Sequence, residues 1–170
     1  MRLVILGAGG YGRMAADVAA QTGEYEAILF LDDNSQAEDV AGKCGAYADF
    51  ADEHTAFYPA IGNNEIRLNW LEMLLAGGCR VANLIHPTAY ISPTARMAQG
   101  VAVLPHAIVN TGCVLEMGCI VNSGAIVDHG CVLEAGAHVS PGGIVKAENR
   151  IPRCLKVESG EVVQNRTYPL

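Results

Sequence analysis

The sequence predicts an α/β plus all-β fold in two parts: a Rossmann-like domain, followed by a parallel coil of short strands. Two observations support this prediction. The first half alternates apolar runs with glycine-containing turns and helical stretches, whereas the second half repeats a pattern of small and aliphatic residues at every sixth position. We expect the first domain to span 1–85, the coil 86–148 and a terminal lid 149–170.

The chain opens with an apolar strand at residues 3–6, the turn GAGGYG at 7–12 and an alanine-rich helix at 13–20. Glycines let a backbone approach a phosphate, and the free N–H groups at a helix N-terminus attract its charge. Glycines in such turns also serve close packing of helix and strand, so both roles stay open, with phosphate binding favoured. The candidate ligand residues of this turn are Gly7, Gly9, Gly10 and Tyr11.

A second strand at 27–31 ends in Asp32-Asp33, where a dinucleotide fold places an acid to bind a ribose hydroxyl. The same pair is also typical of a turn that caps a loop. Residues 38–55 are weakly patterned and predict a loop with a short helix.

A third strand at 57–61 leads into Gly62-Asn63-Asn64, and leucines spaced over 68–75 then predict a helix with one buried face. A strand at 81–85 completes a β-α-β-β-α-β order. This domain is too short for two mononucleotide-binding halves, which favours a mononucleotide or a nucleotide-sugar over NAD.

Small residues recur at every sixth position of the second half: Ala89, Ala95, Val101, Ala107, Cys113, Cys119, Ala125, Cys131, Ala137 and Gly143. An aliphatic residue or methionine stands two positions after each, and glycine precedes most of them. A stride of six stacks equivalent side chains when about three strands make one turn of a coil. The pattern resembles the short left-handed parallel β-helix of hexapeptide-repeat proteins, in which the three repeat cysteines would be small hydrophobes.

Composition excludes several functions. The formal net charge is −7 and no run of Lys or Arg occurs, so we expect neither nucleic acid nor an anionic membrane as a partner. The N-terminus has the pattern of a strand and not of a signal sequence, which predicts a cytoplasmic protein. The six cysteines form no C-x-x-C pair and no zinc spacing, so we expect free thiols and no metal.

Two histidines, His129 and His138, interrupt the repeat nine residues apart. Val127 and Val139 already fill the interior positions of these hexads, so both imidazoles should point outward. Neutral imidazole is well suited to take a proton from an amine or hydroxyl near pH 7, and Asp128 can orient it. We therefore expect His129 to be the general base and His138 or a backbone N–H to stabilise the oxyanion, without a covalent intermediate.

Five segments are similar to those of bacterial UDP-4-amino-sugar N-acetyltransferases and sialic acid O-acetyltransferases, over about residues 1–147: GAGGYG, LDD, AIGNNEIR, VANLIHPTAYISPTA and NSGAIVDHGCVLEAGAHVS. The resemblance implies a homotrimer that acetylates a nucleotide-sugar, a UDP-amino sugar above all, with acetyl-CoA as the donor. It implies that His129 is catalytic and that His138 contacts the acetyl group. It also assigns the nucleotide-sugar to three segments and acetyl-CoA to the turn after His138: Gly7 to Gly12, Asp32-Asp33, Gly62-Asn63-Asn64, and Gly142, Gly143 and Ala147 with His138.

The chain departs from this family at three points. Tyr11 stands where many relatives carry a histidine, Gly130 stands where an acid often follows the catalytic histidine, and the repeat is lost near Lys146. One alternative is a trimeric nucleotide-sugar-binding or scaffold protein without activity. Another is a γ-type carbonic anhydrase with zinc on His106, His129 and His138, although the closely spaced ligand pair of that family is missing.

Overall fold

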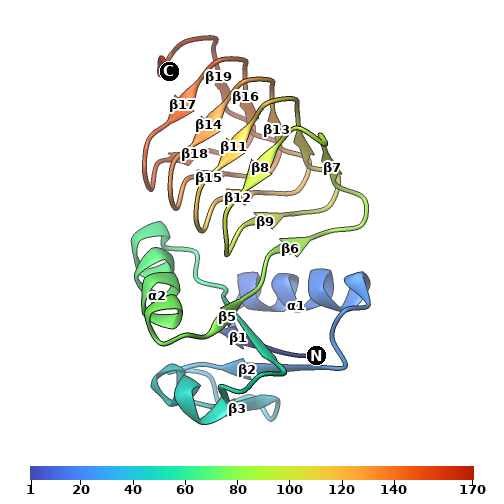
Figure 1. Cartoon of the computed structure of the whole chain (residues 1–170), viewed down its shortest axis with the longest axis vertical. Coiled ribbons are helices and arrows are strands. Elements are labelled where there is room, and N and C mark those ends of the chain that lie inside the picture. Colours follow the sequence, from blue (N-terminus) through green and yellow to red (C-terminus); the bar gives the residue numbers. More distant parts are fainter. The chain divides into compact units, whose positions relative to one another are not determined.

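The computed structural model describes residues 1–170 and divides into two compact units, Met1–Asn83 and Leu84–Leu170 (Figure 1). No helix combines the length and the apolar composition that a bilayer crossing needs. The first unit contains, in chain order, β1 (Arg2–Leu6), α1 (Gly10–Thr22), β2 (Ala27–Leu31), β3 (Val40–Gly42), the 3-10 helix η1 (Cys44–Phe50), β4 (Thr55–Pro59), α2 (Asn64–Ala76) and β5 (Arg80–Val81).

The first unit is built on one parallel sheet with the strand order β3-β2-β1-β4-β5. The central strand β1 is a continuous apolar run, and its residues 3–6 are fully buried, as expected for a strand covered on both faces. Helix α1 packs on β1 and β2, and helix α2 packs on β4 and β5. Because the strands are parallel, the loops after β1, β2 and β4 all leave the same edge of the sheet.

Three features of the first unit differ from the sequence-based expectation. Helix α1 begins at Gly10, so half of the glycine turn is helical. The weakly patterned region contains the strand β3, which pairs with β2 at the edge of the sheet. The strand expected at 81–85 is divided, because β5 pairs with β4 of the first unit whereas Leu84–Ile85 pairs with a strand of the second unit.

The second unit consists of fourteen two-residue strands joined by turns. They are β6 (Leu84–Ile85), β7 (Tyr90–Ile91), β8 (Arg96–Met97), β9 (Ala102–Val103), β10 (Ile108–Val109), β11 (Val114–Leu115), β12 (Ile120–Val121), β13 (Ile126–Val127), β14 (Val132–Leu133), β15 (His138–Val139), β16 (Ile144–Val145), β17 (Arg150–Ile151), β18 (Lys156–Val157) and β19 (Val162–Val163).

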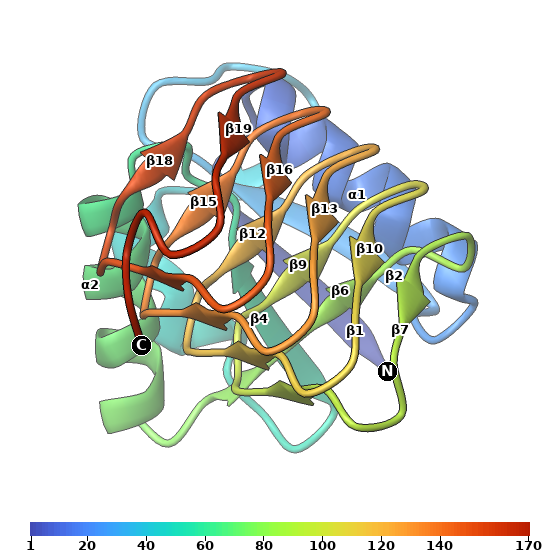
Figure 2. The ribbon, with the colours of Figure 1, turned by 90° about the horizontal axis from the view of Figure 1, so that it is seen from above.

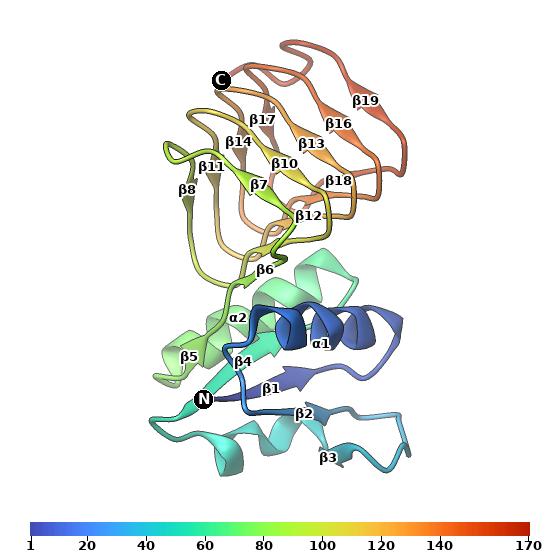
Figure 3. The same cartoon turned by 90° about the vertical axis from the view of Figure 1, so that its right-hand side faces the viewer.

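These strands form three parallel sheets, which we call the β6, β7 and β8 sheets after their first members. Consecutive strands belong to different sheets, so each turn of the chain passes three sides of the coil, as Figure 2 shows from above. Each strand pairs with the equivalent strand one turn later, as Val109 does with Val127. The stacked turns in Figure 3 are consistent with a left-handed β-helix.

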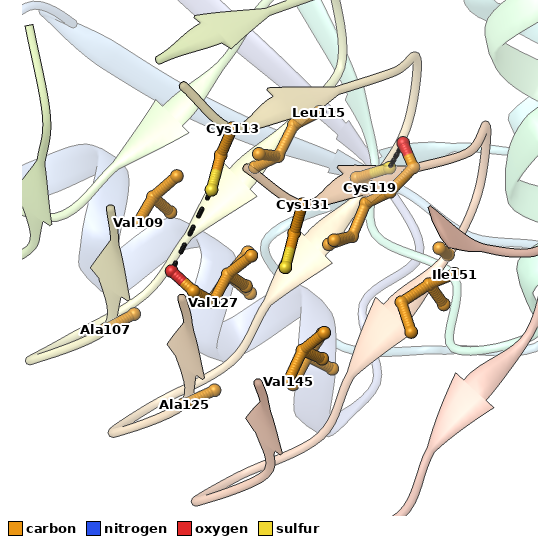
Figure 4. Packing of buried hydrophobic residues seen from close by; sticks show 14 of the residues in the cluster. Ala107, Val109, Cys113, Leu115, Cys119, Ala125, Val127, Cys131, Val145 and Ile151 are labelled. Atoms are coloured by element: carbon orange, nitrogen blue, oxygen red, sulfur yellow. Dashed lines mark hydrogen bonds between the residues drawn. The ribbon is translucent and has the colours of Figure 1, made fainter. Parts of the chain in front are cut away.

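The interior of the coil is a single stack of buried aliphatic and small side chains (Figure 4). Cys113, Cys119 and Cys131 are fully buried members of this stack, and none of the six cysteines is in a disulfide. The thiol of Cys113 lies 3.9 Å from the carbonyl oxygen of Val127, within reach of a weak sulfur hydrogen bond. The repeat cysteines therefore act as small hydrophobes that fit where alanine stands in other turns.

The coil does not end at residue 148, and residues 149–170 are not a separate lid. Strands β17, β18 and β19 each add a member to one of the three sheets. The aliphatic stride persists at Ile151, Val157 and Val163, but non-glycine residues such as Glu148 (φ 58°) and Cys154 (φ 56°) take the left-handed turn position. This costs roughly 1 kcal/mol per residue and removes the glycine signal from the sequence.

The last residues close the open end of the coil. The backbone N–H of Arg150 donates to the carbonyl of Tyr168 at 2.7 Å, and the N–H of Tyr168 donates to Asn149 Oδ1 at 2.9 Å. The buried amide of Asn149 also donates to the carbonyls of Lys146 and Gln164, each at 2.8 Å. Side-chain hydrogen bonds thus satisfy backbone groups that a further turn of the coil would pair.

Candidate functional site

The glycine turn after β1 contains two glycines at positions where a side chain would clash and two at positions where a side chain would meet no other atom. A Cβ on Gly12 would lie 2.0 Å from the carbonyl oxygen of Gly7, and a Cβ on Gly7 (φ 105°) would lie 2.8 Å from that of Ala60. At Gly9 and Gly10 a Cβ would meet nothing within 4 Å. No side chain caps the N-terminus of α1, so its first N–H groups lie beside open backbone, which suits an anionic ligand.

The acidic pair after β2 ties this turn to the neighbouring loops. Asp32 Oδ2 accepts the N–H of Ala8 at 2.7 Å, and Oδ1 accepts those of Asn34 and Ser35 at 2.7 and 2.8 Å. These three backbone hydrogen bonds, led by the one from Ala8, hold the pKa of Asp32 below its usual range. The loop-capping role that the sequence left open for Asp32 is therefore present, and a role with ribose stays a prediction.

The loop after β4 is fixed by a buried arginine that the sequence analysis did not single out. Asn63 Oδ1 accepts the N–H of Ile66 at 3.0 Å and so caps α2, while Asn64 Oδ1 accepts from Arg67 Nη2 at 2.8 Å. Arg67 is fully buried, and its Nη1 donates to the carbonyl of Ile61 at 3.0 Å. The segment AIGNNEIR contains this arginine, but its role depends on burial, which the spacing does not reveal.

Tyr11, in the first turn of α1, forms a hydrogen bond with a second tyrosine. The hydroxyl oxygens of Tyr11 and Tyr58 lie 2.5 Å apart, and the rings meet edge to face. Burial raises the pKa of Tyr11 well above its usual value, and Tyr58 adds to this effect. Both phenols therefore keep their protons at neutral pH. Tyr58 was not predicted, because β4 shows only its apolar character in the sequence.

In the second unit, His129 is exposed in the turn between β13 and β14. Its backbone N–H donates to Asp128 Oδ1 at 2.7 Å, and the same oxygen accepts from Asn110 Nδ2 at 3.2 Å. The hydrogen bonds of Asp128 thus fix the backbone of His129. Asn110 holds the same position 18 residues earlier, and that offset is the signal that would have identified it.

The next turn of the coil brings an acid to His129. The backbone N–H of Glu148 donates to the carbonyl of His129 at 3.2 Å. Its carboxylate accepts from Nε and Nη2 of Arg166 at 2.9 and 2.6 Å. Arg166 lowers the pKa of Glu148, and His129 acts weakly in the same direction. Glu148 was not predicted from the sequence; it lies 18 residues after Gly130, at the equivalent position of the next turn.

His138 lies on another side of the coil. It belongs to β15 in the β6 sheet, whereas His129 follows β13 of the β7 sheet (Figure 2). Its Nε2 is 3.0 Å from the amide nitrogen of Asn122, whose oxygen accepts the N–H of Ser123 at 2.8 Å. Asn122 is buried and was not predicted. The two histidines are therefore not neighbours within one chain.

The residues expected to contact acetyl-CoA are divided in the same way. Gly142 is exposed in the turn after β15, with open space where its Cβ would be, and Gly143 is buried beside Val139. Ala147 is buried in the turn after β16, at the position that His129 holds one turn earlier. The structure thus brings together His138 with the two glycines, and separately His129 with Ala147.

No three His, Cys, Asp or Glu side chains of the chain gather closely enough to hold a metal ion. His106, His129 and His138, the ligands that the carbonic anhydrase alternative requires, do not meet within one chain.

The chain is similar to known proteins over nearly its whole length. The family model described as the PglD N-terminal domain matches residues 2–74. The acetyltransferase domain of PglB from Neisseria gonorrhoeae FA1090 is 37% identical over 97% of this chain and 83% of that chain, with a TM-score of 0.94. The same domain has been solved in complex with acetyl coenzyme A, at the same TM-score and with 82% of that chain covered. A mutant of perosamine N-acetyltransferase from Caulobacter crescentus, in complex with CoA and GDP-perosamine, is 25% identical over 92% of this chain and 76% of that chain, with a TM-score of 0.85.

Proposed function

The chain belongs to the hexapeptide-repeat family of sugar acetyltransferases, and we propose that it transfers the acetyl group of acetyl-CoA to the amino or hydroxyl group of a nucleotide-activated sugar. The observation that carries this proposal is the 37% identity to an acetyltransferase domain over 97% of the chain. That domain binds acetyl coenzyme A, and the Caulobacter relative binds CoA and GDP-perosamine. A nucleotide-linked amino sugar is therefore the acceptor class that we expect.

His129 is the proposed general base. As the acceptor nitrogen or oxygen attacks the thioester carbonyl carbon, His129 takes its proton. The tetrahedral intermediate then collapses, the C–S bond breaks, and the imidazolium of His129 returns the proton to the CoA thiolate. Two features support this role: the imidazole is exposed to a ligand, and Asp128 with Asn110 fixes the backbone that carries it. His138 or a backbone N–H is the proposed donor to the oxyanion.

The nucleotide part of the acceptor is assigned to the first unit. The open backbone at Gly9 and Gly10, next to the uncapped N-terminus of α1, supports diphosphate binding there. The other proposed ligand residues follow β1, β2 and β4 at the same edge of the sheet, where parallel α/β sheets bind their ligands. They are Tyr11, Asp32, Asp33 and the loop Gly62-Asn63-Asn64. In the second unit, the exposed glycine turn after His138 suits the approach of an extended thioester arm.

We infer that the active assembly is a homotrimer. A site that uses both His129 and His138 needs two copies of the chain, because one copy holds them on different sides of its coil. The outer face of the β7 sheet supports such contact, since it carries an apolar ladder in register: Tyr90, Ile108, Ile126, Ile144 and Val162. Tyr90 and Val162 are 54% and 40% exposed. Packing this face on a different face of the next copy is a head-to-tail contact, which gives a closed trimer when successive copies are rotated by one third of a turn.

The test is acetyl-CoA consumption by the purified protein with a panel of UDP-, GDP- and CMP-linked amino and hydroxy sugars. His129→Ala should lower kcat by about 10²- to 10⁴-fold, the usual contribution of a general base. His106→Asn is the matched control, because His106 is also an exposed turn histidine and asparagine tolerates its left-handed backbone (φ 58°). Turnover that survives in His129→Ala would reject the mechanism. Nucleotide-sugar binding without any turnover would favour the binding-protein alternative.

A further inference from the structure

A negative charge nearby would stabilise the imidazolium that the proposed mechanism forms on His129, and its own turn and the next each carry a carboxylate. Asp128 precedes it in the same turn, and Glu148 lies over it from the next turn. Asp128 Oδ1 is occupied by the backbone N–H of His129 and by the amide of Asn110. Oδ1 of Asp128 thus holds the backbone of the turn, and Glu148 supplies a second carboxylate there.

Glu148 is held directly against the His129 turn. Its N–H donates to the carbonyl of His129 at 3.2 Å. A Cβ built on Gly130 would lie 3.8 Å from Glu148 Cγ, so the glutamate side chain covers the glycine that follows the histidine. The backbone of Glu148 is left-handed (φ 58°), a conformation that its own turn imposes on a residue with a side chain.

The carboxylate of Glu148 is anchored at one oxygen only. Both contacts from Arg166 go to Oε2, and no hydrogen bond is made to Oε1. The neighbouring guanidinium keeps the pKa of Glu148 below its usual range, so the group is ionised at neutral pH. The structure thus places against the turn of the proposed base a carboxylate that is paired with Arg166 through Oε2 and keeps Oε1 without a hydrogen bond.

We propose that Glu148 is a positioning residue that stabilises the protonated form of His129 from the next turn of the coil. The inference rests on the proposed role of His129 as the base. The proton that leaves the acceptor then resides on an imidazole whose charge is balanced by the glutamate of the following turn, and it passes from there to the departing thiolate. Both groups are partly exposed, so the effect is modest in size.

Glu148→Gln is the first test, because it removes the charge and keeps an acceptor for Arg166. We expect kcat to fall about fivefold, the factor that corresponds to about 1 kcal/mol, with little change in KM for either substrate. The acidic limb of the pH profile of kcat/KM should move to lower pH, because the variant loses the negative charge that favours protonated His129. The other charged side chains of this corner are unchanged: Asp128, Lys146 and Arg166. Glu148→Asp, which keeps the charge, should recover part of the loss.

A transfer of the acid between turns separates charge from folding. Glu148→Gly should behave like Glu148→Gln, and adding Gly130→Glu to it should restore most of kcat, because a side chain at 130 reaches the space that Glu148 fills. In the double variant, glycine occupies the left-handed position at 148 and glutamate occupies the left-handed position at 130. The backbone at 130 (φ 67°) is close to the one that Glu148 adopts in the unaltered protein (φ 58°), so glutamate can be accommodated there. Thermal unfolding of each variant verifies the fold.

A titration of His129 by NMR tests the inference without turnover. The midpoint of its imidazole signals should lie at lower pH in Glu148→Gln than in the unaltered protein. An unchanged midpoint together with an unchanged kcat would overturn the role of Glu148 and leave His129 as the base. A shifted midpoint in a protein that transfers no acetyl group would instead retain the charge coupling and reject the proposed function.

Discussion

Asp32 accepts the backbone N–H of Ala8 at 2.7 Å, which joins the loop after β2 to the glycine turn after β1. The same carboxylate accepts the N–H groups of Asn34 and Ser35. One side chain therefore fixes the shape of two loops that leave the same edge of the sheet. The ligand-binding geometry proposed for the first unit depends on a residue whose hydrogen bonds are all internal.

Replacing Asp32 with Asn should lower the free energy of unfolding by about 2 kcal/mol, because an amide nitrogen cannot accept the N–H that Oδ2 now binds. The folded-state pKa of Asp32 is depressed. Its contribution is therefore full above the unfolded-state pKa, about 3.9, and is lost as pH falls through the folded-state value. Urea unfolding at neutral and acidic pH measures both effects. A variant with unaltered stability and an unaltered pH slope would show that these hydrogen bonds do not stabilise the turn.

Gly12→Ala and Gly10→Ala form a matched pair in α1. The first places a Cβ 2.0 Å from the carbonyl oxygen of Gly7, and the second meets nothing within 4 Å. We expect Gly12→Ala to cost about 3 kcal/mol or more, and Gly10→Ala to be neutral or stabilising by up to about 1 kcal/mol. Thermal unfolding followed by circular dichroism compares them. Equal stability of the two variants would contradict the packing role of Gly12.

The six thiols should divide by burial when the folded protein is alkylated. Cys79 and Cys154 are partly exposed, whereas the other four are buried. Burial also raises the pKa of Cys44 to about 11, which keeps it as the unreactive thiol. Mass spectrometry should find Cys79 and Cys154 modified before the other four in the native protein, and all six modified after unfolding. Rapid modification of a repeat cysteine without unfolding would mean that the coil opens locally.

Ser140 carries a fully buried hydroxyl for which the chain offers no hydrogen-bond partner. An unsatisfied buried hydroxyl costs about 1 to 3 kcal/mol. Ser140→Ala should therefore be neutral or raise the stability by about 1 kcal/mol, measured by urea unfolding. A loss of stability or of activity in this variant would indicate that a ligand or a second copy of the chain satisfies the hydroxyl.

Ile126→Glu should disrupt self-association, because it puts a charge in the middle of the apolar ladder on the β7 sheet. Val114→Glu is the control: it changes an equally outward, half-buried position of the β8 sheet, which ends in Arg96 and Arg150 and has no such ladder. Multi-angle light scattering should show a trimer for the unaltered protein and the control, and smaller species for Ile126→Glu. Dissociation of both variants alike would mean that the ladder is not the interface.

The six-residue stride by itself determined that the second half is a parallel coil. Interior positions such as Val109 and Val127 must stack when equivalent residues return at a fixed interval, whatever the detailed geometry. The aliphatic part of this signal continues to Val163, but the glycine part stops near residue 148 and so hid the last turn of the coil. Glycine at the left-handed position of each turn is visible in the sequence. In the last turns this position is held by Glu148 and Cys154, which adopt the same conformation at a modest cost, so the turns no longer show in the sequence.

The first unit divides in the same way. Apolar runs and glycine turns predicted β1, α1, β2, β4 and α2, because a strand or helix with a buried face shows a regular pattern of apolar residues. The three-residue edge strand β3 was missed, since a strand that pairs on one side needs little apolar pattern. The strand expected at 81–85 was divided between the units, because pairing partners and not local propensity decide where a short strand belongs.

For the site, the sequence by itself determined which residues are candidates for the chemistry: His129, His138, Asp128 and the glycine turn. Only the tertiary structure decided which of them are neighbours. It placed the histidines on different sides of the coil, joined Asp32 to Ala8, and brought Glu148 over His129. The physical reason is that chemical type is local to a residue, whereas adjacency depends on the number of residues in each turn of the coil and on the register of the strands.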